Sequence, residues 1–146
     1  MRVISHSENE TFRIGFDLGQ KLRVGDLLCF FGDLGAGKTT CIKGIVHGCT
    51  GHPVEAICSP TFTYLNIYEG ALPVYHFDLY RIKGSDDFLG MGFDEYLQRD
   101  GICCVEWSER IEELLHTIPI IRVEISHYGE NLRQITIKGA QLEDRI

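Results

Sequence analysis

The clearest chemical signature in the chain is the segment Gly32-Asp33-Leu34-Gly35-Ala36-Gly37-Lys38-Thr39, which matches the P-loop pattern G-x-x-x-x-G-K-[ST] at every fixed position. Glycines let a backbone curl until successive amide hydrogens converge on phosphate oxygens, and a helix that starts just after them points its positive dipole end at the same place. The segment therefore predicts a phosphate site in which the main chain of Gly35, Ala36 and Gly37 contacts a nucleotide.

The last two residues of this motif carry functional side chains. Lys38 is expected to reach the β and γ phosphates, and the hydroxyl of Thr39 to bind Mg²⁺. A glycine-rich turn without a ligand would also explain the glycines, but the apolar run before the motif and the helical spacing after it favour a nucleotide site.

A magnesium site of this type also needs an acidic group at the end of a neighbouring strand. Ile102–Val105 is an apolar run ending in Glu106, and Val74–Phe77 is a more aromatic run ending in Asp78. From spacing alone both carboxylates stay open, one for the metal and one for the attacking water. Either could also be an ordinary surface carboxylate at a strand end.

Weaker candidates lie nearby in the sequence. Ser59–Thr63 follows the expected P-loop helix, and its hydroxyls could sense the γ-phosphate, although a turn entering a strand explains the segment equally well. Arg81 could offset charge in the transition state, but a solvated side chain is the commoner role of a lone arginine. Trp107 is expected to pack beside the site.

The elements around the motif follow from hydrophobic pattern. Arg2–Ser5 is expected to be a strand, and the capping box Ser7–Glu10 favours a helix after it, although the next apolar residues also alternate as in a strand. Leu27–Phe31 is typical of a central strand buried on both faces. Thr39–Val46 then has helical spacing, which completes a strand–loop–helix unit.

The rest of the chain alternates between strands and short helices. The pattern predicts two strands joined at Glu69-Gly70 within 59–80, a loop-rich stretch over 84–92, a short helix over 93–98, a strand over 102–106, a helix over 110–116, and an antiparallel pair formed by 120–126 and 133–138. Together the elements predict an α/β fold in one domain spanning 1–146: a P-loop NTPase-like three-layer sandwich with a mostly parallel central sheet and an antiparallel C-terminal extension.

Bulk properties exclude several classes of protein. The chain has 146 residues, 44% of them hydrophobic, and a formal charge of -7, which disfavours general nucleic-acid binding. Its longest apolar run, near Leu27–Phe31, is far shorter than the roughly 20 residues of a membrane span. The amino terminus lacks the apolar stretch of a secretory signal, and the six cysteines form no C-x-x-C pair, so a cytoplasmic protein with reduced thiols is expected.

Three further blocks, taken together with the P-loop, make the pattern more specific. The P-loop, Ser59-Pro60-Thr61-Phe62-Thr63, His76-Phe77-Asp78-Leu79-Tyr80-Arg81 and Val105-Glu106-Trp107 occur in an order and spacing that resemble the bacterial TsaE (YjeE) family. The resemblance covers nearly the whole chain, including Gly92–Leu97. Departures are mild: Phe93 replaces a smaller aliphatic residue, and 130–133 is a variant of a segment that usually closes on Gly-Arg.

The resemblance implies an ATPase that takes part in making N6-threonylcarbamoyladenosine at position 37 of tRNA. Members of the family bind ATP and Mg²⁺, associate with the TsaB–TsaD pair, and hydrolyse ATP to support repeated turnover of that transferase, so that tRNA is met only through the complex. By this likeness Thr39 and Glu106 would bind Mg²⁺, Lys38 and Thr40 the phosphates, and Asp78 would be needed for hydrolysis. Thr11 resembles a family position near the nucleotide base.

Two other functions remain as alternatives. A P-loop small-molecule kinase would usually bring several arginines over the phosphates, and the sequence has no arginine-rich lid segment. A GTP-controlled switch is weakened because no Asn-Lys-x-Asp element is present to read guanine.

Overall fold

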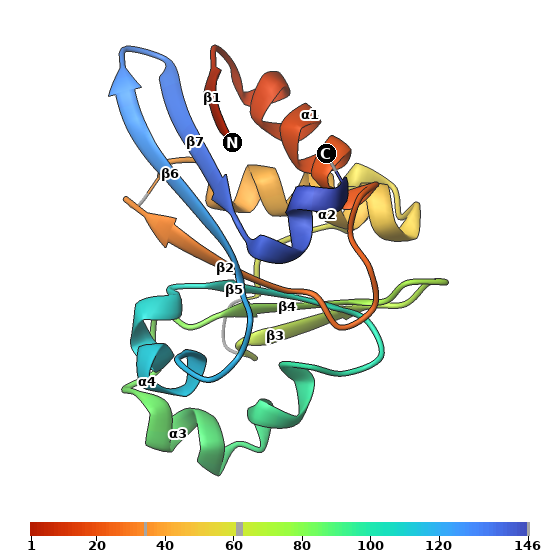
Figure 1. Cartoon of the computed structure of the whole chain (residues 1–146), viewed down its shortest axis with the longest axis vertical. Helices are drawn as coiled ribbons and strands as arrows, with labels where there is room; N and C mark the ends of the chain where they lie inside the picture. Colours follow the sequence, from red (N-terminus) through yellow and green to blue (C-terminus); the bar gives the residue numbers. More distant parts are fainter. Residues whose placement is uncertain (34, 61–62, 146) are drawn as a thin grey trace.

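The computed structural model describes residues 1–33, 35–60 and 63–145. Its main feature is one seven-stranded sheet with the strand order β1-β7-β6-β2-β5-β4-β3 (Figure 1). The strands are β1 (Arg2–Ser5), β2 (Leu27–Gly32), β3 (Leu65–Tyr68), β4 (Val74–Asp78), β5 (Ile102–Glu106), β6 (Ile121–Gly129) and β7 (Leu132–Lys138).

The middle of the sheet is parallel and both of its ends are antiparallel. Strands β6, β2, β5 and β4 run parallel to one another, which brings their carboxyl ends to one edge of the sheet. β7 pairs with β6 and β1 pairs with β7, both antiparallel, and β3 pairs antiparallel with β4. The predicted antiparallel C-terminal pair is confirmed as β6 and β7, and the amino-terminal strand β1 adds to it as a third antiparallel strand.

Helices cover the two faces of the sheet, as Figure 1 shows. On one side lie α1 (Glu8–Gly19) and α2 (Lys38–Thr50), and on the other lie α3 (Ser85–Gly90) and α4 (Glu112–Leu115) with the 3-10 helices η2 (Phe93–Tyr96) and η3 (Ser108–Ile111). Two more 3-10 turns, η1 (Val54–Ala56) and η4 (Ala140–Arg145), connect or finish the chain.

Alternation along β2 divides the buried side chains between these faces. Leu28 and Phe30 pack in the cluster that contains the apolar residues of α1 and α2, whereas Leu27 and Cys29 pack in the cluster with Phe88 of α3. A strand buried on both faces reads as a continuous apolar run because neither set of alternate side chains meets water. This is why the run 27–31 predicted a central strand correctly.

The first helix begins as the capping box predicts. Ser7 is the N-cap, and its hydroxyl accepts the backbone N–H of Glu10 at 3.0 Å. The Glu10 carboxylate in turn accepts the backbone N–H of His6 at 2.6 Å. The Ser7 bond satisfies an amide that the first turn of a helix leaves without a partner, and the Glu10 bond holds the residue before the N-cap. The helical interpretation of this ambiguous segment is therefore confirmed.

Close contact between α1 and α2 depends on glycine. A β-carbon at Gly15 would overlap the carbonyl oxygen of Cys41, and one at Gly44 would overlap the carbonyl oxygen of Phe12. The two backbones therefore touch, and this contact fixes Thr11 of α1 beside the start of α2.

Two sequence predictions need correction on the far face. The stretch 84–92, predicted to be loop-rich, contains α3, because Phe88 is fully buried against Phe77 and Phe93 and this packing stabilises a short helix between glycines. The helix predicted over 110–116 is confirmed only in part: the α-helix α4 covers four residues of the range, and the 3-10 turn η3 precedes it. The predicted short helix after Gly92 is confirmed as η2.

Candidate functional site

The loop between β2 and α2 has a backbone that only glycines adopt readily. Gly32, Gly35 and Gly37 have φ angles of 137°, 76° and 105°. At Gly32 a β-carbon would also overlap the carbonyl oxygen of Ile125 on β6. The predicted strand–loop–helix unit is therefore present, although Leu34 lies outside the described residues.

Lys38, the first residue of α2, folds back across this loop. Its Nζ donates to the carbonyl oxygen of Gly32 at 2.8 Å and lies 4.3 Å from the centre of the Trp107 ring. Only 5% of the residue is exposed. One hydrogen bond and one cation–π contact thus hold the ammonium group at the loop. If a polyphosphate bound here, the ammonium group could replace both contacts with stronger charge-assisted hydrogen bonds.

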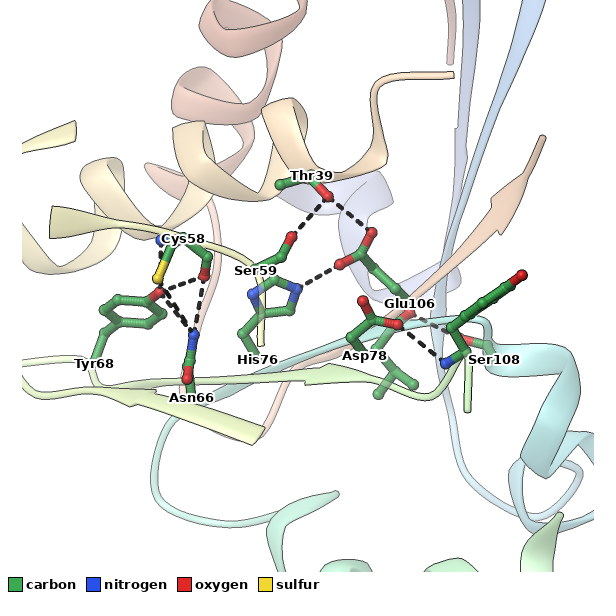
Figure 2. Close-up of polar contacts among 11 residues, drawn as sticks. Thr39, Cys58, Ser59, Asn66, Tyr68, His76, Asp78, Glu106 and Ser108 are labelled. Atoms are coloured by element: carbon green, nitrogen blue, oxygen red, sulfur yellow. Dashed lines mark hydrogen bonds and ion pairs between the residues drawn. The ribbon is translucent and has the colours of Figure 1, made fainter. Parts of the chain in front are cut away.

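Thr39 connects the loop to the carboxyl end of β5. Its hydroxyl donates to Oε1 of Glu106 at 3.2 Å, and Ser59 Oγ lies 3.0 Å from the same hydroxyl oxygen (Figure 2). A hydroxyl has one proton to donate, so Ser59 is the donor in the second bond. A threonine hydroxyl, a serine hydroxyl and a carboxylate therefore converge on one point.

Glu106 has a second partner, His76, on the neighbouring strand β4. His76 on β4 has Nε2 at 2.8 Å from Oε2 of Glu106, and the two side chains are 1% and 5% exposed. The other ring nitrogen, Nδ1 of His76, is buried and has no hydrogen-bond partner among the described residues. Each carboxylate oxygen of Glu106 therefore has a different protein partner.

Asp78 ends β4 directly opposite Glu106 in the parallel register. Its Oδ1 accepts the backbone N–H of Tyr80 at 3.0 Å. Partial burial raises the pKa of Asp78 above its ordinary value. The hydrogen bond from Tyr80 lowers this pKa, whereas the nearby charge of Glu106 raises it. Two carboxylates thus share this edge of the sheet, one buried and the other half-buried.

Two open clefts meet at the glycine loop. The smaller, about 340 Å³, is lined by the P-loop residues and by the ends of β4 and β5: Gly35, Gly37, Lys38, Thr39, Thr40, Asp78, Tyr80, Glu106 and Trp107. The larger, about 590 Å³, lies towards α1 and the β6–β7 hairpin and is lined by His6, Ser7, Glu8, Thr11, Gly35, Ala36, Gly37, Thr40, Asn131 and Arg133. A ligand that lay along the loop could occupy both.

These clefts bring together the residues predicted to bind the nucleotide and Mg²⁺ or to act in hydrolysis. Lys38, Thr39, Asp78 and Glu106 line the smaller one, and Thr11 lies in the larger one, where its hydroxyl is 2.7 Å from Ser5 Oγ. Thr40, Gly35 and Gly37 line both, and Ala36 lines the larger.

The weaker candidates lie close by. Arg81 lines a hollow of about 170 Å³ that it shares with Asp78, and Trp107 packs beside Lys38 as expected. Of the possible switch segment, Ser59 contacts Thr39, whereas Thr61 and Phe62 lie outside the described residues.

Sequence reasoning did not assign several residues that the structure places at or beside the site. Asn131 and Arg133 reach the larger cleft from the β6–β7 hairpin, and no local pattern marks them. The sequence did contain a signal for His76. Residues two apart on a strand point to the same face, so the candidate Asp78 implies that His76 lies on the face of the site.

The side chains around Glu106 fit a magnesium ion. Mg²⁺ prefers oxygen ligands and is usually held by one or two protein oxygens together with substrate phosphates and water. Thr39 and Glu106 supply two such oxygens beside the phosphate loop. The donor set is therefore of the right chemistry for this ion next to a bound polyphosphate.

Comparison with known proteins agrees with the sequence motifs. The sequence model described as threonylcarbamoyl adenosine biosynthesis protein TsaE matches residues 5–135. The TsaE protein of Treponema pallidum is 36% identical over 94% of this chain and 99% of its own length, and that of Bacillus subtilis is 42% identical over 77% and 68%. The crystal structure of YdiB from Bacillus subtilis superposes with a TM-score of 0.77 at 33% identity, over 95% of this chain and 84% of the other.

Both the sequence match and the shared fold extend across the strands and the loop that form the two clefts. The chain therefore belongs to the TsaE family of threonylcarbamoyl adenosine biosynthesis proteins.

Proposed function

We propose that this TsaE-family chain binds Mg-ATP on the loop from Gly32 to Thr39 and hydrolyses it. In this proposal hydrolysis supports repeated turnover of the TsaB–TsaD transferase during synthesis of N6-threonylcarbamoyladenosine in tRNA. The observation that carries it is the bond from Thr39 to Glu106, which joins the end of a complete P-loop motif to a buried carboxylate on the neighbouring strand.

The two clefts suggest how the nucleotide lies. Its phosphates would occupy the smaller cleft, where the loop amides, Lys38 and Thr40 can contact them. The base and ribose would extend into the larger cleft beside Thr11. The glycines with positive φ between the clefts support this placement, because they let main-chain amides approach the phosphates closely.

Magnesium would be held by Thr39 and Glu106 together with the phosphates. When bound, it would offset the negative charge that develops on the phosphates during hydrolysis. The fold around it supports the proposal of a P-loop NTPase-like three-layer sandwich, since a parallel core carries helices on both faces and the carboxyl ends of its strands meet at the loop.

Asp78 is the residue we assign to the attacking water. It lies beside Glu106 but is not part of the Thr39 and His76 contacts, so its carboxylate is available to orient a water or accept its proton. A raised pKa makes a carboxylate a better base, and burial raises the pKa of Asp78. Lys38 would act with it by stabilising charge on the γ-phosphate.

Family membership and the net charge of the chain support the proposed partners. An acidic chain of net charge -7 is poorly suited to capture tRNA by itself, so tRNA would be met through the TsaB–TsaD pair in the cytoplasm. Among the residues that the structure describes, none of the helices has the length and apolar character needed to cross a lipid bilayer.

A phosphate-release assay with and without purified TsaB–TsaD tests the proposal. The chain should hydrolyse ATP in the presence of Mg²⁺, faster with the pair than alone, and chelation of Mg²⁺ should stop the reaction. A chain that neither binds the pair nor hydrolyses ATP in its presence contradicts the proposal, as does efficient phosphoryl transfer to a small-molecule acceptor.

A further inference from the structure

The contact between His76 and Glu106 is the buried polar pair closest to the proposed magnesium site. His76 Nε2 lies 2.8 Å from Oε2 of Glu106, and Oε1 of the same carboxylate accepts the Thr39 hydroxyl at 3.2 Å (Figure 2). One oxygen of Glu106 is thus bonded to the buried His76, and the other is bonded to Thr39 at the end of the glycine loop.

We propose that His76 is a positioning residue for the cation site: its Nε2–H holds Oε2 of Glu106, so that Oε1 is presented beside Thr39 as the magnesium ligand. This inference depends on the proposed function, because it assigns His76 a role only if Mg²⁺ binds at Thr39 and Glu106.

The hydrogen-bonding roles follow from the chemistry of the two groups. A carboxylate oxygen accepts, so the proton in the hydrogen bond between His76 and Glu106 is carried by Nε2 of His76. Nδ1 is buried without a partner among the described residues, so the bond to Glu106 is the one polar contact found there for the imidazole. The orientations of the ring and of the carboxylate are therefore set together.

The sheet explains why His76 can hold this position. His76 is paired in register with Cys104, two residues before Glu106 on β5, and Asp78 is paired with Glu106 itself. Because His76 and Asp78 are two residues apart on β4, their side chains share one face of the strand, and His76 can reach Glu106 on the neighbouring strand. His76 is 1% exposed, and the cleft-lining residues around the phosphate loop do not include it, which rules out direct contact with the nucleotide in this conformation.

A buried polar histidine could instead serve folding alone, and the two roles predict different measurements. Removing a partner that orients a metal ligand typically weakens metal affinity by about 10–100-fold while leaving the ligand itself in place. A purely structural histidine would lower the melting temperature without a selective effect on cation affinity.

Electron paramagnetic resonance of Mn²⁺, used in place of Mg²⁺, measures that affinity directly in the presence of ADP. His76→Gln keeps an N–H donor close to the position of Nε2, His76→Leu removes it at similar size, and His116→Leu replaces an exposed histidine as the control. We expect His76→Leu to bind Mn²⁺ at least about tenfold more weakly than wild type, and His76→Gln and the control to stay within about threefold. Affinity for ADP in the presence of a chelator should be the same in all four proteins.

A folded His76→Leu protein with wild-type Mn²⁺ affinity would overturn the inference while leaving the proposed function intact. If His76→Leu does not fold, nitrogen NMR of the imidazole in wild type decides: the inference requires the Nε2–H tautomer and a change of the His76 signals when Mg²⁺ joins the ADP complex. An Nδ1–H tautomer or unchanged signals would contradict it. Failure of the wild-type protein to bind Mn²⁺ with nucleotide would instead remove the proposed site altogether.

Discussion

Asp78 and Glu106 occupy paired positions at the ends of the adjacent parallel strands β4 and β5. Glu106 is buried and hydrogen-bonded through both carboxylate oxygens, whereas the Asp78 side chain is half-buried and accepts the backbone N–H of Tyr80. The same sheet edge therefore carries two carboxylates in different settings, and the proposed function assigns Glu106 to the cation and Asp78 to the attacking water.

Asp78→Ala should stop ATP hydrolysis while leaving nucleotide binding nearly unchanged. Loss of a positioned base typically lowers a rate by about 10²–10⁴-fold, and the proposal assigns nucleotide binding to the loop and Asp78 to the water. Phosphate release gives the rate, and the fluorescence of Trp107, the one tryptophan of the chain, gives binding, because its ring lies 4.3 Å from Lys38 Nζ. Asp86→Ala, on the exposed surface of α3, is the matched control; hydrolysis at the wild-type rate by Asp78→Ala would show that our role for Asp78 is wrong.

The raised pKa of Asp78 also predicts how stability varies with pH. A carboxyl whose pKa is higher in the folded than in the unfolded state costs folding free energy when ionised, and this cost disappears as pH falls below its pKa. Asp78→Asn should therefore raise the melting temperature at pH 7, and the gain should shrink as the pH is lowered towards 4. Thermal unfolding of both proteins across this range checks it, with Asp86→Asn as the control for the lost charge. A gain that grows at low pH would mean that the sign of the shift is wrong.

Replacing a glycine between α1 and α2 should destabilise the fold. A β-carbon at Gly15 meets the backbone of Cys41, which cannot move without shifting α2, so Gly15→Ala should lower the free energy of unfolding by about 1–3 kcal/mol. Gly90→Ala has no heavy atom within 4 Å of the new methyl group and should change stability by less than about 1 kcal/mol. Urea unfolding measures both, and equal stability of the two variants would contradict the close helix contact.

The parts of the fold that could be predicted were those with strong local patterns. The apolar run 27–31, the glycine motif and the capping box at Ser7 each specify one backbone state, and each is found as expected. The stretch 84–92 could not be predicted, because α3 depends on contacts of Phe88 with rings distant in the sequence rather than on its own spacing.

The candidate site divides in the same way. Lys38, Thr39 and Thr40 belong to a contiguous motif, so sequence was enough to find them. Glu106 and Asp78 were both identified, but their different burial depends on the sheet register, and spacing could not distinguish their roles. Arg133 reaches the larger cleft only because the β6–β7 hairpin lies beside α1, which no local pattern reports.

The central claim is that the Gly32–Thr39 loop holds Mg-ATP, and calorimetric titration tests it most directly. Wild type and Lys43→Ala, a control on the same helix, should bind Mg-ATP, whereas Lys38→Ala should bind at least about 100-fold more weakly because it loses the ammonium group at the phosphates. Folded wild-type protein that shows no affinity for Mg-ATP, alone or with TsaB–TsaD, would contradict the account.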